Sequence, residues 1–213
     1  MNCLGTGELL LNRKKQSVAL PLFIVFILLG VLIFFYFFAF IPIKGRSMEN
    51  TIFEDQYCFV QRKGYSVSRG DIVIIEVPND DDNGTHDIVK RVIGVAGDRL
   101  IFMRSANNAV IETYICKKGE NHFNKLNESY IKEPMHNVNF HDTWVLQYDP
   151  LLTTYNLDTL DHQTYAGIDP FILYVPKNSI YFLGDNRNIS GDSRKYGTRT
   201  LDKVKYKVIK VMY

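Results

Sequence analysis

One stretch of the sequence carries no charged side chain along its whole length, and it limits what the chain can fold into. Residues 16–43 contain no Asp, Glu, Lys, Arg or His, and residues 20–43 are nearly all Leu, Ile, Val and Phe. A helix needs about 20 apolar residues to cross the hydrocarbon core of a bilayer, which is roughly 30 Å thick. The stretch is long enough to span a membrane once, and we expect residues 17–43 to be a transmembrane anchor.

A cleaved secretory signal peptide is the alternative for this stretch, because Arg13, Lys14 and Lys15 precede it. The apolar region of a signal peptide usually has about 7–15 residues and ends in small residues. This stretch is longer and ends in FFAFIPIKG, which favours an uncleaved anchor. The basic triplet predicts that residues 1–16 remain in the cytoplasm and that residues 44–213 lie across the membrane.

The part of the chain after the anchor is balanced in charge, with 22 basic and 22 acidic residues. This balance gives no electrostatic reason to expect a nucleic acid as partner. Cys58 and Cys116 follow the anchor, whereas Cys3 precedes it, so Cys58 and Cys116 either pair in an oxidising compartment or stay as buried thiols. No metal-ligand spacing is present, and we expect no metal and no other cofactor.

Short segments rich in β-branched and aromatic residues predict that residues 44–213 form a mostly β domain. The expected strands are residues 57–61, 72–77, 88–95, 99–103, 109–116, 171–175 and 179–183. The C-terminal run alternates Val204, Tyr206 and Val208 with lysines, which is the period of a half-buried strand.

Residues 117–168 interrupt this pattern with polar, Asn-rich sequence, and within them only residues 143–148 resemble a strand. Structureless loops of this length are uncommon inside compact domains. We therefore expect residues 117–168 to be an inserted lid or subdomain.

A serine, Ser47, follows the anchor in the segment KGRSMEN. A serine hydroxyl becomes a competent nucleophile when a base lies within hydrogen-bond reach and donors stabilise the oxyanion. Histidine is the usual base, but surface positions in polar loops are expected for all five histidines: His86, His122, His136, His141 and His162.

Lys90 is the other candidate base, because it lies inside the apolar segment IVKRVIGV. Alternation places Ile88, Lys90 and Val92 on one face of the expected strand. Burial would lower the pKa of the Lys90 ammonium from its ordinary value of about 10.4 and make the amine a base near neutral pH. The alternative is a lysine that extends into water from the wet face of a strand.

A third stretch, GDNRNISGDSRKYG at residues 184–197, is rich in turn-forming residues and paired charges. It follows an N-terminal anchor, Ser47-Met48, RGDIVIIEVP at residues 69–78 and KRVIGVAGD at residues 90–98. In this order the segments resemble the type I signal peptidases, membrane-anchored Ser/Lys proteases that remove signal peptides from exported proteins. The resemblance covers the anchor and most of the β core but not residues 117–168, and it implies an antiparallel β catalytic core of the signal peptidase type.

The resemblance implies a role for each matching position. Ser47 would be the nucleophile and Lys90 the general base of a dyad that acts through an acyl-enzyme, with Ser190 orienting the lysine amine. The Ser47 backbone N–H would stabilise the oxyanion. The positions expected to support the site are Arg91, Gly184, Asp185, Asn186, Arg187, Asp192 and Arg194. The residues that flank the dyad in sequence, and that we expect to line two shallow substrate pockets, are Ile43, Met48, Ile88 and Val89.

Three positions depart from the family pattern. Asn50 stands where S-M-x-P-T usually has proline, and Asn188 replaces a common aspartate in G-D-N-R-D. Gly45 stands where some members have a serine that supplies a second oxyanion donor. Asn50 and Asn188 keep open the alternative of a degenerate, non-catalytic binding protein in the membrane. A second alternative is a specialised maturation protease of the same fold that serves one secretion or conjugation system.

The resemblance also implies partners and a location. The substrates would be signal peptides of exported preproteins, cut after small residues at A-x-A type sites. The anchor would contact membrane lipid, and the enzyme would act alongside the secretion translocon. It would be a single-pass protein of the cytoplasmic (inner) membrane, with its catalytic domain on the extracytoplasmic (periplasmic) side.

Overall fold

A computed structural model describes residues 19–81, 83–104, 110–136 and 172–212. Helix α1, Ala19–Phe37, has no buried side chain and is long and apolar enough to cross a membrane. The helix as far as Tyr36 belongs to one compact unit, and Phe37–Tyr213 forms a second. The expected anchor extends to residue 43, whereas the helix ends at Phe37 and is followed at once by strand β1, Phe38–Pro42.

Strand β1 pairs antiparallel with β2, Tyr57–Gln61, along its whole length. This pairing supplies the backbone hydrogen bonds that a continued helix would have made. The Phe59 ring in β2 stacks on Phe38 with centroids 5.3 Å apart, and it also contacts Phe40 at 5.1 Å. The sequence does not reveal the change from helix to strand, because Phe and Ile suit both a membrane helix and a β-strand.

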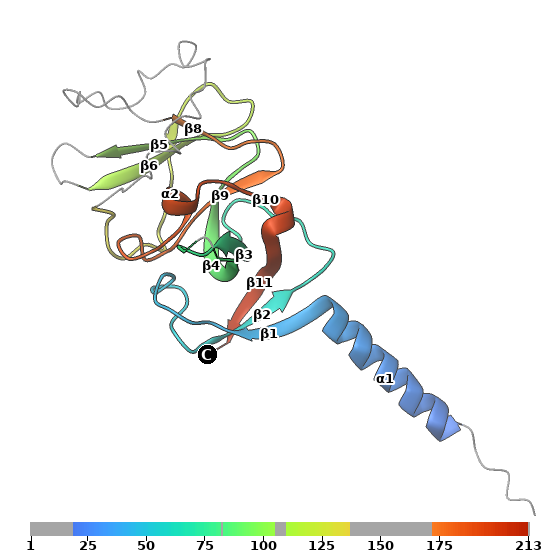
Figure 1. Cartoon of the computed structure of the whole chain (residues 1–213). Helices are drawn as coiled ribbons and strands as arrows, with labels where there is room; N and C mark the ends of the chain where they lie inside the picture. The colour runs from blue at the N-terminus through green and yellow to red at the C-terminus, as the bar shows by residue number, and fades with distance from the viewer. Residues whose placement is uncertain (1–18, 82, 105–109, 137–171, 213) are drawn as a thin grey trace, which may run out of the picture. The chain divides into compact units, whose positions relative to one another are not determined.

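The second unit is mostly antiparallel β, which confirms the predicted fold class. Within the described residues, one sheet has the order β1-β2-β11-β3-β4-β9-β10 and a smaller one the order β7-β6-β5-β8 (Figure 1). The larger sheet includes β3 (Ile72–Pro78), β4 (Thr85–Val95), β9 (Ser179–Leu183), β10 (Arg199–Thr200) and β11 (Val204–Met212). The smaller sheet consists of β5 (Arg99–Arg104), β6 (Ile111–Cys116), β7 (Asn124–Lys125) and β8 (Ile172–Tyr174). A short helix, α2 (Ser193–Tyr196), and a 3-10 turn, η3 (Leu201–Lys203), lie between β9 and β11 in sequence.

The strands predicted from period and composition all form, apart from residues 143–148, which lie outside the described residues. Strands β7 and β10 are not predicted, because two residues are too short to show a period. Strand β7 belongs to the expected insert, of which the structure describes residues 117–136. The described start of the insert therefore adds a strand to the smaller sheet.

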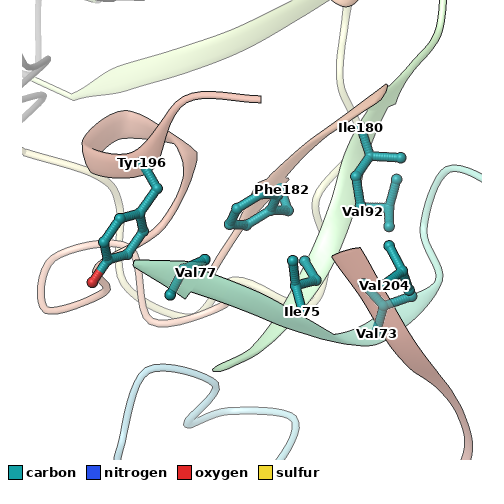
Figure 2. Close-up of a cluster of buried hydrophobic side chains, with 8 residues drawn as sticks. All are labelled: Val73, Ile75, Val77, Val92, Ile180, Phe182, Tyr196 and Val204. Carbon is teal, nitrogen blue, oxygen red and sulfur yellow. The ribbon is translucent and has the colours of Figure 1, made fainter. Parts of the chain in front are cut away.

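Both faces of β3 are buried, which explains its nearly continuous apolar sequence. One face belongs to the cluster in Figure 2, which draws side chains from β3, β4, β9, β11 and α2: Val73, Ile75, Val77, Val92, Ile180, Phe182, Tyr196 and Val204. The other face contributes Ile74 to a second cluster with Ile43, Met48, Ile52, Cys58, Val60 and Val89. A third cluster joins the two sheets and contains Ile93, Leu100, Ile115, Val175, Tyr181 and Leu183.

Cys58 in β2 and Cys116 in β6 are both buried free thiols, and they lie in different sheets. Burial raises the pKa of the Cys58 thiol to about 11. A thiol that stays protonated at neutral pH is a poor nucleophile and behaves as a small apolar side chain. Of the two alternatives that the sequence leaves open, the structure has the buried thiols.

The first cluster yields a test of the core. We expect Phe182→Ala to lower the free energy of unfolding by about 3–5 kcal/mol, because it removes a fully buried ring and leaves a cavity between strands. Urea unfolding followed by far-ultraviolet circular dichroism measures the change. Leu201→Ala is the control, because this side chain is exposed, and a similar loss in both variants would contradict the assignment.

Candidate active site

Ser47 lies on a tight turn that follows β1. The Thr51 and Ile52 N–H groups both donate to the Met48 carbonyl, at 3.0 and 2.9 Å. The Met48 side chain is 0% exposed and packs in the second apolar cluster, whereas Ser47 keeps partial contact with solvent. The buried methionine therefore anchors the turn and leaves the neighbouring hydroxyl accessible.

The Lys90 side chain points at this hydroxyl from β4, where Lys90 is opposite Val73 of β3. Its Nζ atom lies 2.6 Å from Ser47 Oγ and 2.8 Å from the Val89 carbonyl oxygen. The residue is only 2% exposed, so Lys90 is not on a wet face of the sheet. The structure thus brings a serine hydroxyl and a buried amine into direct contact across 43 residues of sequence.

Burial also changes the acidity of this amine. The pKa of Lys90 falls from 10.5 to about 8, chiefly because burial desolvates the ammonium. The Asp192 and Asp185 carboxylates oppose this shift, and the Arg194 guanidinium adds to it. An amine with a pKa near 8 can accept a proton close to neutral pH, which an ordinary lysine does not do.

Asp185 ties the strand of Lys90 to the serine turn. Arg91 donates to both of its carboxylate oxygens, at 2.9 and 2.6 Å, and the Thr51 hydroxyl donates to one of them. The Asp185 N–H in turn approaches the Met48 sulfur at 3.4 Å. One buried carboxylate therefore fixes three parts of the site: the residue after the lysine, the serine turn and the loop that begins at Gly184.

A second buried pair shapes that loop. Arg194 donates to both oxygens of Asp192 at 2.8 Å, and Asp192 also accepts the Gly184 N–H at 3.0 Å. Arg194 further donates to the Arg187 carbonyl at 2.6 Å. The loop is also joined to the serine turn, because the Asn186 N–H donates to the Ser47 carbonyl at 3.0 Å.

Gly184 has no space for a side chain. An added Cβ would lie 2.2 Å from Ser190 Oγ and 2.4 Å from the Ser47 carbonyl oxygen. Ser190 and the serine turn therefore lie against the same glycine. The Ser190 hydroxyl is buried and has no hydrogen-bond partner among the described residues, so it makes no hydrogen bond to Lys90.

The backbone N–H groups near Ser47 differ in whether they already have a hydrogen-bond acceptor. Gly45 has a φ of 83°, and its N–H donates to Glu54 Oε1 at 2.9 Å, so this donor is already occupied. The Ser47 N–H has no acceptor among the described residues. The Ser47 N–H, which is the oxyanion donor expected from the sequence, is therefore free among the described residues, whereas the Gly45 N–H is not.

Asn50 has a φ of 96° in the turn that follows the serine. Proline is locked at a φ near −65° and could not adopt this conformation. Asparagine is one of the few residues other than glycine that enters the left-handed region readily. The asparagine that stands in place of the proline of S-M-x-P-T therefore has a backbone conformation that proline could not adopt.

The expected pocket residues divide between two clusters. Ile43, Met48 and Val89 pack together in the second apolar cluster, next to the serine turn. Ile88 packs against the first cluster instead.

The described histidines are not part of this site. His86, His122 and His136 are exposed, while His141 and His162 lie outside the described residues. The described residues also contain no group of three or more His, Cys, Asp or Glu side chains that could hold a metal ion.

One set of contacts is missed by the sequence-based predictions: it joins the start of the insert to the loop after Gly184. Glu128 forms a two-pronged ion pair with Arg187. Asn188 donates to the Pro134 carbonyl at 3.0 Å and accepts the His136 N–H at 3.1 Å. An aspartate at this position could accept the His136 N–H but could not donate to the Pro134 carbonyl. These two contacts explain the asparagine at position 188. A buried arginine needs a carboxylate partner, and this requirement is the one signal for such a contact. It does not say which carboxylate the partner is.

Comparison with known proteins places the chain in a family. The model of the family described as "Signal peptidase, peptidase S26" matches residues 16–213. The chain belongs to the signal peptidase family. It is therefore a peptidase by family, and the expected membership is confirmed.

Individual relatives agree with this family. Signal peptidase I of Buchnera aphidicola subsp. Schizaphis graminum is 24% identical over 246 residues, which cover 92% of this chain and 75% of that protein. Signal peptidase IB of Staphylococcus aureus is 28% identical over 169 residues, which cover 78% of this chain and 73% of the relative. A crystal structure of a signal peptidase I from Enterococcus faecalis aligns with 70% of this chain and 100% of that chain, at 20% identity and a TM-score of 0.39.

The turn after the serine gives a prediction for this signal peptidase. Because Asn50 has a φ of 96°, we expect Asn50→Gly to keep the stability of the wild type and Asn50→Pro to lose more than about 1 kcal/mol. Thermal unfolding of the two variants measures the difference. A proline variant as stable as the glycine variant would show that the turn does not need a positive φ.

Proposed function

We propose that the chain is a signal peptidase I that removes signal peptides from exported preproteins, with Ser47 as nucleophile and Lys90 as general base. The observation that carries the proposal is the 2.6 Å contact between Ser47 Oγ and Lys90 Nζ, made by an amine that is almost wholly buried. A nucleophile and a base within hydrogen-bond reach are the minimum that covalent peptide hydrolysis requires. Membership of the signal peptidase family and the names of the relatives support the choice of substrate.

The reaction proceeds by acyl transfer. Ser47 Oγ attacks the carbonyl carbon on the N-terminal side of the scissile bond, and the Lys90 amine takes the hydroxyl proton. The resulting ammonium returns this proton to the leaving amine, which departs as the new N-terminus of the mature protein. Water then hydrolyses the acyl-enzyme, with the Lys90 amine again accepting the proton. The free Ser47 N–H is the donor that we assign to the oxyanion.

Ser190 completes the catalytic unit in this proposal, as the hydroxyl that orients the Lys90 amine. Its hydroxyl is buried, lies against Gly184 beside the Ser47 carbonyl and has no partner among the described residues. An unpaired buried hydroxyl costs about 1–3 kcal/mol, so a movement of the amine that satisfied it would be favourable. Arg91, Asp185, Asp192 and Arg194 hold the surrounding backbone in place.

Specificity and location follow from the surroundings of the serine. Ile43, Met48 and Val89 would form the apolar floor of the pocket for the small residue before the cut, and Ile88 would flank the neighbouring position. An extended A-x-A segment suits such a groove, because alternate side chains point to one side. Helix α1 would anchor the enzyme in the cytoplasmic membrane, with the catalytic domain outside the cytoplasm and near the secretion translocon.

Removal of either dyad residue tests the proposal. We expect Ser47→Ala and Lys90→Met each to lower cleavage of a preprotein with an A-x-A site by at least about 10²-fold, because each removes a group that takes part in the chemistry. Gel separation of precursor and mature protein gives the rate. Ser129→Ala and Lys210→Met, both at exposed positions, are matched controls. Unchanged cleavage in either dyad variant would disprove the dyad, and a panel of unrelated preproteins would distinguish broad from specialised use.

The pH dependence of cleavage tests the base. Lys90 accepts a proton only when neutral, and its pKa is about 8, so we expect kcat/KM to rise with pH through about 8 and then to level off. A rate that continued to rise toward the ordinary lysine pKa of 10.5 would indicate a solvated lysine. A pH-independent rate above pH 6 would indicate a different base.

A further inference from the structure

Two residues at the start of the insert contact both arginines that adjoin the catalytic motifs. Glu128 and Tyr130 follow β7, in a part of the chain with no recognisable motif. Arg91 is the residue after Lys90, and Arg187 lies in the loop that begins at Gly184. The contacts connect the lysine strand and this loop through a third segment.

Glu128 holds Arg187, whose residue is only 2% exposed. The Arg187 Nη1 atom lies 3.1 Å from Glu128 Oε2, and Nη2 donates to Glu128 Oε1. The remaining donor, Nε, binds the Gly184 carbonyl at 3.0 Å. A buried guanidinium requires a carboxylate to offset its desolvation, and a two-pronged pair also fixes its orientation. Glu128 thereby fixes the orientation in which the Arg187 guanidinium binds the Gly184 carbonyl.

Tyr130 holds Arg91 in a different way. The Arg91 guanidinium carbon lies 4.0 Å from the centre of the Tyr130 ring, which is the geometry of a cation–π contact. The Tyr130 hydroxyl donates to Glu128 Oε1 at 3.0 Å. The two residues therefore form one continuous set of contacts from Arg91 to Arg187.

We infer that Glu128 and Tyr130 act together as positioning residues, the Glu128–Tyr130 bracket, which holds Arg91 and Arg187 and so fixes the lysine strand relative to the loop after Gly184. Neither residue touches the reacting atoms. The effect on activity rests on the proposed function, whereas the effect on the geometry around Lys90 does not. The inference gives a role to residues of the insert that the family motifs do not include.

The bracket has an electrostatic consequence at Lys90. The charged groups that act on this amine are Asp185 and Asp192, which favour the ammonium, and Arg194, which opposes it. Arg91 is the ion-pair partner of Asp185, so its alignment decides how much of that carboxylate charge is compensated. If the bracket is lost and Arg91 tilts away, Asp185 stabilises the ammonium more strongly. The pKa of Lys90 should then rise, which a mere loss of stability would not produce.

The test uses the full chain in detergent micelles with ¹³C-labelled lysine. We expect Glu128→Gln and Tyr130→Leu to raise the pKa of Lys90 in an NMR titration of the lysine Cε signals, assigned by the signal that Lys90→Met lacks. At neutral pH we expect kcat for preprotein cleavage to fall about 10-fold with little change in KM, and to recover partly at higher pH. Tyr130→Phe should have a smaller effect, because it keeps the ring under Arg91 and loses only the hydroxyl.

The chain contains a matched control for these variants. On β6, Tyr114 donates to Glu112 at 2.9 Å, and Lys125 pairs with the same carboxylate at 2.6 Å. This group repeats the tyrosine, carboxylate and cation of the bracket, with Lys125 as the cation in place of an arginine. We expect Glu112→Gln and Tyr114→Leu to leave both the pKa of Lys90 and kcat unchanged.

Two outcomes would overturn the inference. The first is that the pKa of Lys90 in both Glu128→Gln and Tyr130→Leu equals the wild-type value. The second is that the control variants shift the pKa of Lys90 as much as the bracket variants do. If Glu128→Gln does not fold, because Arg187 is left without its carboxylate, Tyr130→Leu decides alone. If the wild type and Ser47→Ala process preproteins equally, the proposed function fails, while the NMR comparison still decides whether the bracket exists.

Discussion

The Lys90 amine lies almost wholly out of water, and a charged ammonium in such a place costs several kcal/mol unless its surroundings compensate. The domain compensates in three ways: the amine contacts Ser47 and the Val89 carbonyl, its pKa falls to about 8, and the Asp185 and Asp192 carboxylates lie close enough to favour the charged form. Those carboxylates are themselves buried, so each is paired with an arginine. The buried amine thus belongs to a connected group of buried charges: Lys90, Asp185, Asp192 and Arg194.

The apolar part of the structure gives these charges their positions. Strand β3 is buried on both faces and pairs with β4 along its whole length, which fixes the register of Lys90. Met48 packs in the second cluster and thereby holds the serine turn against the sheet. Gly184 allows that turn and the Ser190 loop to approach more closely than any side chain would permit. The contact between serine and lysine is therefore set by packing on one side and by ion pairs on the other.

The sequence predicts the parts of this arrangement that are local. The strands with clear alternation form where expected, and Ser47, Lys90 and the loop at residues 184–197 were identified from contiguous motifs. The sequence does not distinguish strand Phe38–Pro42 from the anchor, because an apolar aromatic segment fits helix and strand equally and its pairing with β2 is a tertiary contact. Glu128 and Tyr130 could not be found, because one carboxylate and one ring in a polar segment carry no pattern of their own. The hydrogen bond from the Gly45 N–H to Glu54 is likewise a tertiary contact, which the sequence does not show.

The lowered pKa of Lys90 has a consequence for folding. The unfolded chain keeps the Lys90 proton up to its ordinary pKa of 10.5, whereas the folded chain keeps it only up to a pKa of about 8. Between these values unfolding takes up a proton, so this residue makes the fold more stable as pH rises, and below pH 8 the fold carries the whole cost of the buried ammonium. At neutral pH the buried Lys90 ammonium thus lowers the stability of its own domain. The three apolar clusters therefore also offset the cost of burying the Lys90 ammonium.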